Sequence, residues 1–357
     1  MIAFRLGTRR SRLALTQSGQ IADALRAAGH DVELVEIVTE GDTNRAALET
    51  IGGTGVFASA LRRALRAGDI DLAVHSLKDL PTAPEAGLVI AATPVREDVR
   101  DVLVARDGLT LGELPSGARI GTGSPRREAQ LVALGLGVEI VPIRGNVETR
   151  LALVDTGELD AVVLARAGLL RLGLADRATE VLDPIQVLPA AGQGALALEC
   201  RADDSAVCEV LAALDDPETQ ACVTAERTVL ALLEAGCTAP VGVLAEVVEG
   251  VTALDLSVRA FVGTRDGALQ LRRSVTGPAD DPVGVGTRLA ALLLADGAAQ
   301  ARVERGFGAP ASPTTPSGGT TTLDPPGEGQ LAATAEPATR PGMLAQTTAI
   351  DESEKTT

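Results

Sequence analysis

The chain has 357 residues, 45% of them hydrophobic, and a formal net charge of -16. This length indicates two or three domains, and the absence of Trp and Tyr, with only four Phe, leaves Leu, Val, Ile and Ala to build their cores. The acidic balance argues against a protein that binds nucleic acid by bulk electrostatics, and no apolar run approaches the ~20 residues of a membrane span. Because the first residues show no signal-peptide pattern, we expect a soluble, cytoplasmic protein.

The first two-thirds of the chain alternate strand-like and helix-like segments, which predicts α/β structure with mainly parallel sheets. The first set comprises, in chain order, strand 2–6, helix 11–28, strand 32–38, helix 56–67 and strand 70–74. The second set comprises strands 101–105 and 119–121, helix 126–134, strand 138–142, helix 147–155 and strand 160–164, and one more strand follows at 195–199.

Two segments, 93–98 and 188–194, are the natural crossings between these sets. Two crossings make the first domain discontinuous, with residues 1–94 and 195–214 in one lobe and 99–189 in the other. This layout is typical of a two-lobed ligand trap with a central cleft.

The pattern changes after Pro217. Helix 218–234 leads into strands 241–248, 252–262 and 268–276 and then into helical segments 281–295 and 297–305. The sequence therefore predicts a small α+β domain over 217–305. Residues 306–357 are rich in Pro, Thr, Gly and Ala without periodicity, and we expect a disordered tail there.

A proton-active cluster ends the strand at 70–74, in the run "AVHSLKDLPT". Ligands of open α/β sheets bind beyond the carboxyl ends of strands, which makes Lys78 and Asp79 candidates for a site. Lys78 is notable because the chain otherwise uses Arg, and Lys355 is its only other lysine. The plainer interpretation is a solvated turn with an ion pair.

Arginines mark four further junctions between a strand and a helix. The residues at these junctions are Arg9 and Ser11, Ser124 with Arg126 and Arg127, Arg144 and Arg150, and Arg166 with Arg171. Each junction alone is explained by an ordinary helix start. Four of them in an acidic protein favour a cleft lined with guanidinium groups, suited to a ligand with several carboxylates or phosphates. The glycine spacing is not that of a dinucleotide-binding loop or a P-loop.

The four cysteines include one in an unusual place. Cys200, Cys208 and Cys222 lie in predicted strand or helix, where small buried hydrophobes are expected. Cys237 lies in a Gly-Cys-x-x-Pro loop, where a thiol can be exposed and nucleophilic. With no C-x-x-C pair and only two histidines, we expect neither a metal site nor a disulfide framework.

Taken in order, these motifs make residues 2–305 resemble the hydroxymethylbilane synthase (porphobilinogen deaminase) family. The resemblance is carried by "LGTRRSRLAL", "GGTGVF", "AVHSLKDLPT", "REDVRDVLV", "GTGSPRREAQL", "RGNVETRL", "LARAGLLRLG", "LPAAGQGALALECR" and "TAERTVLALLEAGC" followed by "TAPVG". It implies two periplasmic-binding-protein-like lobes and a small C-terminal domain. It also implies a monomeric transferase of porphyrin and haem biosynthesis, which joins four porphobilinogen molecules head to tail with release of ammonia and then hydrolyses the chain to hydroxymethylbilane.

The resemblance also assigns residues. It implies that Cys237 holds a dipyrromethane cofactor through a thioether and that Asp79 is the catalytic carboxylate, with Lys78 beside it. The cofactor would contact Asp79, Lys78, Ser124, Arg126 and Arg127, and the substrate would contact Arg9, Ser11, Arg144, Arg150, Arg171 and Phe57. Many relatives have lysines at the positions of Thr50 and Thr54.

Two other classes of function remain as alternatives at this point. A non-enzymatic two-lobed binding protein for a small polyanion would share the lobes, but it would have no need of the loop cysteine. A phosphate-ester enzyme would use the Gly-Ser-Arg-Arg loop, but it lacks a P-loop and a cluster of metal-binding carboxylates.

Overall fold

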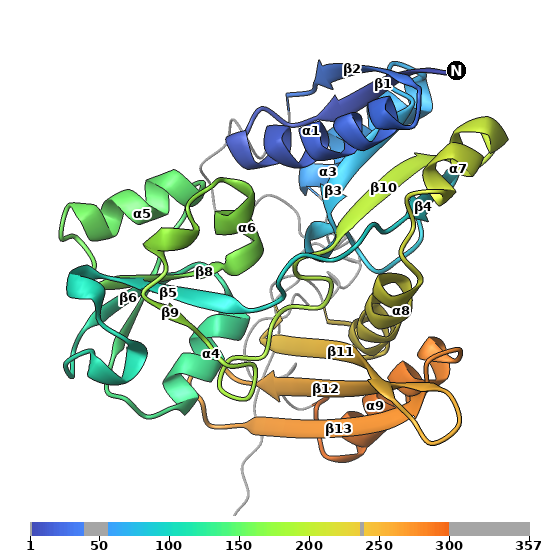
Figure 1. Ribbon diagram of the computed structural model, residues 1–357. Helices are drawn as coiled ribbons and strands as arrows, with labels where there is room; N and C mark the ends of the chain where they lie inside the picture. Colours follow the sequence, from blue (N-terminus) through green and yellow to red (C-terminus); the bar gives the residue numbers. More distant parts are fainter. Residues whose placement is uncertain (1, 39–55, 236–238, 300–357) are drawn as a thin grey trace, which may run out of the picture. The chain divides into compact units, whose positions relative to one another are not determined.

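The computed structural model describes residues 2–38, 56–235 and 239–299 (Figure 1). Two of its sheets have five strands and share one plan. The first sheet has the order β2-β1-β3-β10-β4 and the second has the order β7-β6-β8-β5-β9. In each sheet four strands run in one direction, and the fifth pairs antiparallel with its two neighbours. The chain leaves the first sheet after β4 and returns to it as β10.

The first lobe buries both faces of its sheet. Its strands are β1 (Ala3–Thr8), β2 (Asp31–Glu36), β3 (Leu72–Ser76), β4 (Leu88–Ala92) and β10 (Leu196–Arg201), and its helices are α1 (Arg12–Ala27), α3 (Val56–Ala67) and α7 (Ser205–Ala212). Leu72 and Val74 of β3 pack in a cluster with α1 and α7, while Ala73 packs with α3 on the opposite face. Alternate residues of one strand therefore meet helices on both sides, which explains the continuous apolar run in the sequence.

The second lobe is built in the same way. Its strands are β5 (Asp101–Ala105), β6 (Arg119–Thr122), β7 (Glu139–Pro142), β8 (Ala161–Ala165) and β9 (Glu180–Val181), and its helices are α4 (Pro125–Ala133), α5 (Val147–Asp155) and α6 (Arg166–Arg171). Leu103 and Val163 pack with α4 on one face. Val102 and Val162 pack with α5 and α6 on the other.

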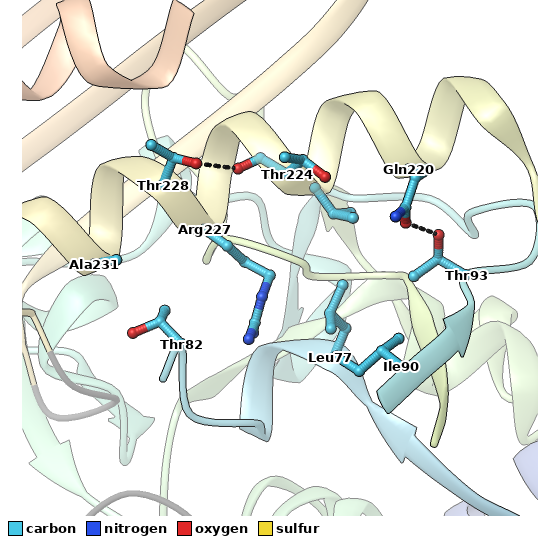
Figure 2. A pocket seen from close by; sticks show the side chains of 10 residues that line it. Leu77, Thr82, Ile90, Thr93, Gln220, Thr224, Arg227, Thr228 and Ala231 are labelled. Atoms are coloured by element: carbon cyan, nitrogen blue, oxygen red, sulfur yellow. Dashed lines mark hydrogen bonds between the residues drawn. The ribbon is translucent and has the colours of Figure 1, made fainter. Parts of the chain in front are cut away.

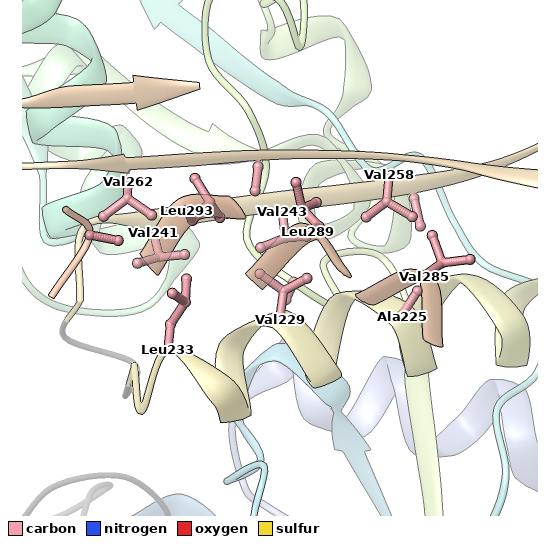
Figure 3. Close-up of a cluster of buried hydrophobic side chains, with 14 of the residues drawn as sticks. Ala225, Val229, Leu233, Val241, Val243, Val258, Val262, Val285, Leu289 and Leu293 are labelled. Atoms are coloured by element: carbon pink, nitrogen blue, oxygen red, sulfur yellow. The ribbon is translucent and has the colours of Figure 1, made fainter. Parts of the chain in front are cut away.

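The third sheet is antiparallel and carries helices on one face. It comprises β11 (Val241–Glu249), β12 (Leu254–Gly263) and β13 (Gln270–Pro278), packed against α8 (Pro217–Leu232) and α9 (Pro282–Ala295). Figure 3 shows that valines and leucines of β11 and β12 meet those of the two helices, and Leu271 and Val275 of β13 pack against this cluster. An aliphatic core was expected from the shortage of aromatic residues, and it is confirmed here.

The expected α/β class with a small α+β domain is confirmed, and most predicted elements lie within two or three residues of the observed ones. No bounds were predicted for β4, β9, α6 or α7, although Cys208 of α7 was expected in regular structure and Arg166 and Arg171 of α6 at a helix junction. The helix expected at 297–305 is not formed at its start, since Gly297–Ala299 form a turn, and its remainder lies outside the described residues. Met1–Ala309 form one compact unit, so the domain limits stay a prediction, and the expected tail at 306–357 lies outside the described residues. Among the described helices, none is long and apolar enough to cross a bilayer.

Candidate functional site

A single turn of 3-10 helix, Leu77–Asp79, follows β3 and presents Lys78 and Asp79. The turn is fixed at its start by the Leu77 backbone N–H, which donates to the Ala195 carbonyl at 3.0 Å. Leu77 and Leu80 are buried on either side of the two charged residues. The hydrophobic anchors therefore hold Lys78 and Asp79 at the carboxyl end of β3, where the sequence predicted them.

The Asp79 carboxylate is exposed, and within the described part of the chain it makes no hydrogen bond or ion pair. It nevertheless acts electrostatically on Lys78 of its own turn and on Arg150 of α5, in the second lobe. A carboxylate in this setting keeps its lone pairs available to N–H donors of a ligand.

Lys78 is partly buried, and its Nζ donates to Gln193 Oε1 at 3.3 Å. Burial lowers the pKa of Lys78 to about 8, although the nearby Asp79 opposes this change. The charges of Asp101, Arg126 and Arg127 also act on Lys78, so the turn of the first lobe lies within electrostatic reach of the second.

Arg126 and Arg127 form a buried cluster with Asp101 at the start of α4. Arg126 Nη1 donates to Asp101 Oδ2 at 2.8 Å and to the Leu188 carbonyl at 2.6 Å. Arg127 Nη2 donates to Asp101 Oδ1 at 2.8 Å. Burial alone would raise the pKa of Asp101, but the two guanidinium groups outweigh it and hold that pKa well below its usual range.

Gln193, which was not among the predicted site residues, joins the two lobes. Its side chain is fully buried, accepts from Lys78, and donates through Nε2 to Asp101 Oδ1 at 2.8 Å and to the Val99 carbonyl at 2.7 Å. One amide therefore connects the Lys78 turn to the arginine cluster. The sequence signal for it was a glutamine between two glycines, in the motif "AAGQGA".

The glycines on either side of Gln193 are required by the backbone. Gly192 and Gly194 have φ values of 72° and 89°, in the region that favours glycine. A Cβ at Gly194 would lie 2.3 Å from the Glu97 carbonyl oxygen. Three groups also hold this turn: Arg96 Nε donates to the Gln193 carbonyl, Arg171 Nη2 donates to the Gly194 carbonyl, and the Gly192 N–H donates to Glu226.

The other predicted arginines differ in how closely they are linked to the Asp101 cluster. Arg150 Nε donates to the Gly145 carbonyl at 2.9 Å, and burial followed by the charge of Arg127 lowers its pKa to about 10. Burial lowers the pKa of Arg171, while Glu97 opposes it. Arg144 is exposed and acts electrostatically on Arg150, and Arg9 is half-buried after β1.

The two predicted serines lie at helix starts. Ser11 caps α1, since its Oγ accepts from the Ala14 backbone N–H at 3.3 Å. Ser124 occupies the N-cap position of α4, but its side chain makes no capping hydrogen bond. The hydroxyl of Ser124 is therefore not engaged by the backbone of its own helix, whereas that of Ser11 is.

His75 and Ser76 are bound into the first lobe. His75 Nε2 lies 3.2 Å from Glu199 Oε2, and Glu199 also pairs with Arg62 at 2.8 Å, all three side chains being buried. Ser76 Oγ accepts from Gln17 Nε2 at 3.1 Å. These contacts hold both side chains within the first lobe.

Several predicted residues cannot be placed. Cys237 and the loop positions Thr50 and Thr54 lie outside the described residues. The backbone of Phe57 belongs to α3, but its side chain is also outside the described part.

A cavity of about 240 Å³ lies between the Lys78 turn and α8, and it is distinct from the arginine cluster (Figure 2). It is lined by Leu77 and Thr82 on one side and by α8 residues, including Thr224 and Arg227, on the other. Arg227 donates to the carbonyls of Leu80 at 3.2 Å and Pro81 at 2.6 Å. None of the predicted site residues lines this cavity, which is smaller than the roughly 300–1,000 Å³ of common ligand pockets.

Comparison with known proteins assigns the family. The sequence model described as "Porphobilinogen deaminase, dipyromethane cofactor binding domain" matches residues 4–209, and "Porphobilinogen deaminase, C-terminal domain" matches residues 220–295. The chain belongs to the porphobilinogen deaminase family. Porphobilinogen deaminase 1 of Streptomyces coelicolor is 57% identical over 313 residues, covering 85% of this chain and 98% of its own. Porphobilinogen deaminase of Nocardia farcinica is 58% identical over 305 residues, covering 84% and 88%.

Among solved structures, lipoprotein Tp32 from Treponema pallidum is similar with a TM-score of 0.40 and 16% identity. The similarity covers 60% of this chain and 90% of that protein. The family membership expected from the sequence motifs is thus confirmed, and it rests on the sequence matches.

Proposed function

We propose that this chain is a hydroxymethylbilane synthase, which condenses four porphobilinogen molecules head to tail with release of ammonia and hydrolyses the product from the enzyme. Family membership supports this activity. The structural observation that carries the proposal is the exposed carboxylate of Asp79 at the end of β3, which acts electrostatically on Lys78 of its own turn and on Arg150 of α5.

We propose that Asp79 is the catalytic residue. A carboxyl group suits both halves of the reaction, because it can protonate the departing aminomethyl nitrogen and, once ionised, stabilise the cation that this departure leaves. Lys78 would hold the local charge balance at the turn, and its ammonium is oriented by Gln193.

The residues near Asp79 fit a dipyrromethane with acidic side chains. Lys78, Arg126, Arg127 and Arg150 are four cationic groups, and the carboxylates that act on them include Asp79 and Asp101. The buried Nε atoms of Arg126 and Arg127 have no hydrogen-bond partner within the described chain. When bound, the cofactor supplies the pyrrole carbon that begins chain growth.

Roles for the remaining residues follow as proposals. Ser124, Arg126 and Arg127 would bind the cofactor carboxylates, and Cys237 would anchor the cofactor through its sulfur. Guanidinium groups match carboxylates in a bidentate geometry, which suits a growing ladder of acetate and propionate groups. The substrate-binding set would comprise Arg9, Ser11, Arg144, Arg150, Arg171 and Phe57.

Intact mass spectrometry of the purified protein tests this function. We expect an adduct equal to two porphobilinogen units less two ammonia, reactive with an aldehyde reagent for pyrroles. Cys237→Ser should lack the adduct, and Cys222→Ser should keep it. A bare chain mass after expression with abundant porphobilinogen would instead favour a non-enzymatic binding protein for a small polyanion.

A second test addresses Asp79 directly. Asp79→Ala should fold, because the side chain is exposed, yet lose nearly all release of ammonia from porphobilinogen. The matched control is Asp107→Asn, an exposed acid of the second lobe with φ of 58°, a conformation that Asn tolerates. Normal turnover in Asp79→Ala would remove Asp79 from the mechanism.

We also propose that the protein acts as a cytoplasmic monomer, with domains at 1–94 with 195–214, 99–189 and 217–305. Equal repetition of strand order in the two lobes supports the domain limits.

A further inference from the structure

Two cysteines outside the proposed site lie side by side in the first lobe. Cys200 is at the end of β10 and Cys208 is in the first turns of α7, and their Sγ atoms are 3.5 Å apart. Sulfurs at this separation need only a small movement to reach the ~2.05 Å of a disulfide bond. Neither thiol has a part in the proposed reaction.

We propose that Cys200 and Cys208 form a redox-active dithiol that hydroperoxides convert to an intramolecular disulfide. The pair differs from the remaining described cysteine, Cys222, which is buried in α8 and has no sulfur partner in the described part of the chain. The disulfide joins the C-terminal end of strand β10 to helix α7.

The two thiols differ in access, and this sets the order of the steps. Cys208 is partly exposed, whereas Cys200 is fully buried in the core that α1 and α7 share. Burial, followed by the hydrogen bond with Cys208, raises the pKa of Cys200 to about 12. Cys208 is therefore the thiol that meets the peroxide, because a peroxide reacts with an accessible thiolate.

The chemistry balances with one molecule of hydrogen peroxide. The Cys208 thiolate attacks one peroxide oxygen, the O–O bond breaks, and the products are a Cys208 sulfenic acid and hydroxide, which takes a proton to become water. Cys200 sulfur then attacks the Cys208 sulfur. The S–S bond forms, the S–O bond breaks, and the departing hydroxide takes the Cys200 proton and leaves as a second water. Both sulfurs are oxidised and both peroxide oxygens are reduced.

The disulfide would form at the end of β10 that is farther from the proposed active site. Cys200 pairs with Leu72 at the start of β3, whereas Leu196, at the other end of β10, pairs with Ser76 beside the Lys78 turn. The link closes a short loop that contains Asp204, the N-cap of α7. We therefore expect it to stabilise the first lobe and to keep the two thiols from irreversible oxidation.

Peptide mapping of the holoenzyme tests the proposal. Arg201 lies between the two cysteines, so trypsin places them in separate peptides, 178–201 and 202–227. The reduced protein is treated with hydrogen peroxide under native conditions, and its remaining thiols are alkylated before digestion. We expect a linked pair of these peptides, two hydrogens lighter than their sum, that dithiothreitol separates again.

Two variants make the result specific, since peptide 202–227 also contains Cys222. Cys222→Ser should keep the linked pair and Cys208→Ser should lose it. The thermal midpoint should rise by a few degrees on oxidation in the wild type and not in Cys208→Ser. A folded wild type in which peroxide yields no linked pair, or in which the link depends on Cys222, would overturn the proposal.

Discussion

The substitution Asp101→Asn tests whether one buried carboxylate holds the arginine cluster together. Asp101 is fully buried and accepts three hydrogen bonds, from Arg126, Arg127 and Gln193, each at 2.8 Å. Asparagine keeps the shape of the side chain but removes its charge and turns one acceptor into a donor. Two guanidinium groups, with side chains 4% and 6% exposed, then lack their counter-charge.

The expected cost is about 3–5 kcal/mol, the usual result of removing one partner from a buried ion pair. For a chain of this size each kcal/mol lowers the thermal midpoint by roughly 2–4 °C, so we expect a fall of about 6–20 °C. Because the chain has neither Trp nor Tyr, calorimetry or far-ultraviolet circular dichroism is the suitable assay.

The matched control is Asp98→Asn. Asp98 pairs with Arg100 and Arg166, whose side chains are 42% and 30% exposed, so its loss should cost about 1 kcal/mol or less. The folded pKa of Asp101 lies below its unfolded value of about 3.9, so its stabilisation is complete above pH ~4 and declines only in stronger acid. Equal losses for the two variants, or a difference that disappears near pH 5, would refute the reasoning.

Three further predictions concern the turn and its supports. Turnover should fall above pH ~8 as Lys78 loses its proton, and Lys78→Arg should move that fall to higher pH; an unchanged profile would exclude Lys78 as its source. Arg227→Met removes both hydrogen bonds to the Leu80 and Pro81 carbonyls, so unfolding free energy should drop by about 1–3 kcal/mol and turnover should fall with it, as calorimetry and ammonia release would measure. Ser11→Ala should lower the unfolding free energy by about 1 kcal/mol, because α1 loses its cap. Ser11→Asp should restore that stability but weaken porphobilinogen binding. Equal porphobilinogen binding by the two variants would exclude contact between Ser11 and the substrate.

Local patterns predicted the elements that have a strong period or a clear terminal signal. Helix α3 begins and ends where the sequence placed it, and α1 differs from the predicted range 11–28 by one residue at each end. No bounds were predicted for β9, which has only two residues, or for α6, which has six. Such short elements carry too few residues for a period to show, and their pairing partners decide whether they form.

The site was predicted residue by residue but not as an arrangement. Motif order predicted Lys78, Asp79, Arg126 and Arg127 as site candidates, and each of them follows a strand of one of the two sheets. It gave no sign that Asp101 would neutralise the arginines. Asp101 lies within the motif "REDVRDVLV", but the motif does not indicate its partners, which are 25 and 26 residues away along the chain.

The sequence by itself determined the family, the class of fold and the identity of the charged residues, because motifs and hydrophobic periods are local properties of the chain. Only the tertiary structure decided how Gln193 links Lys78 to Asp101 and how Cys200 meets Cys208. Both contacts depend on where β10 lies. The chain returns from the second lobe and forms β10 between β3 and β4 of the first sheet. Gln193, just before β10, and Cys200, within it, are thereby brought to their partners. Hydrogen bonds and thiol contacts require atoms within a few ångströms, and chain order does not determine such distances.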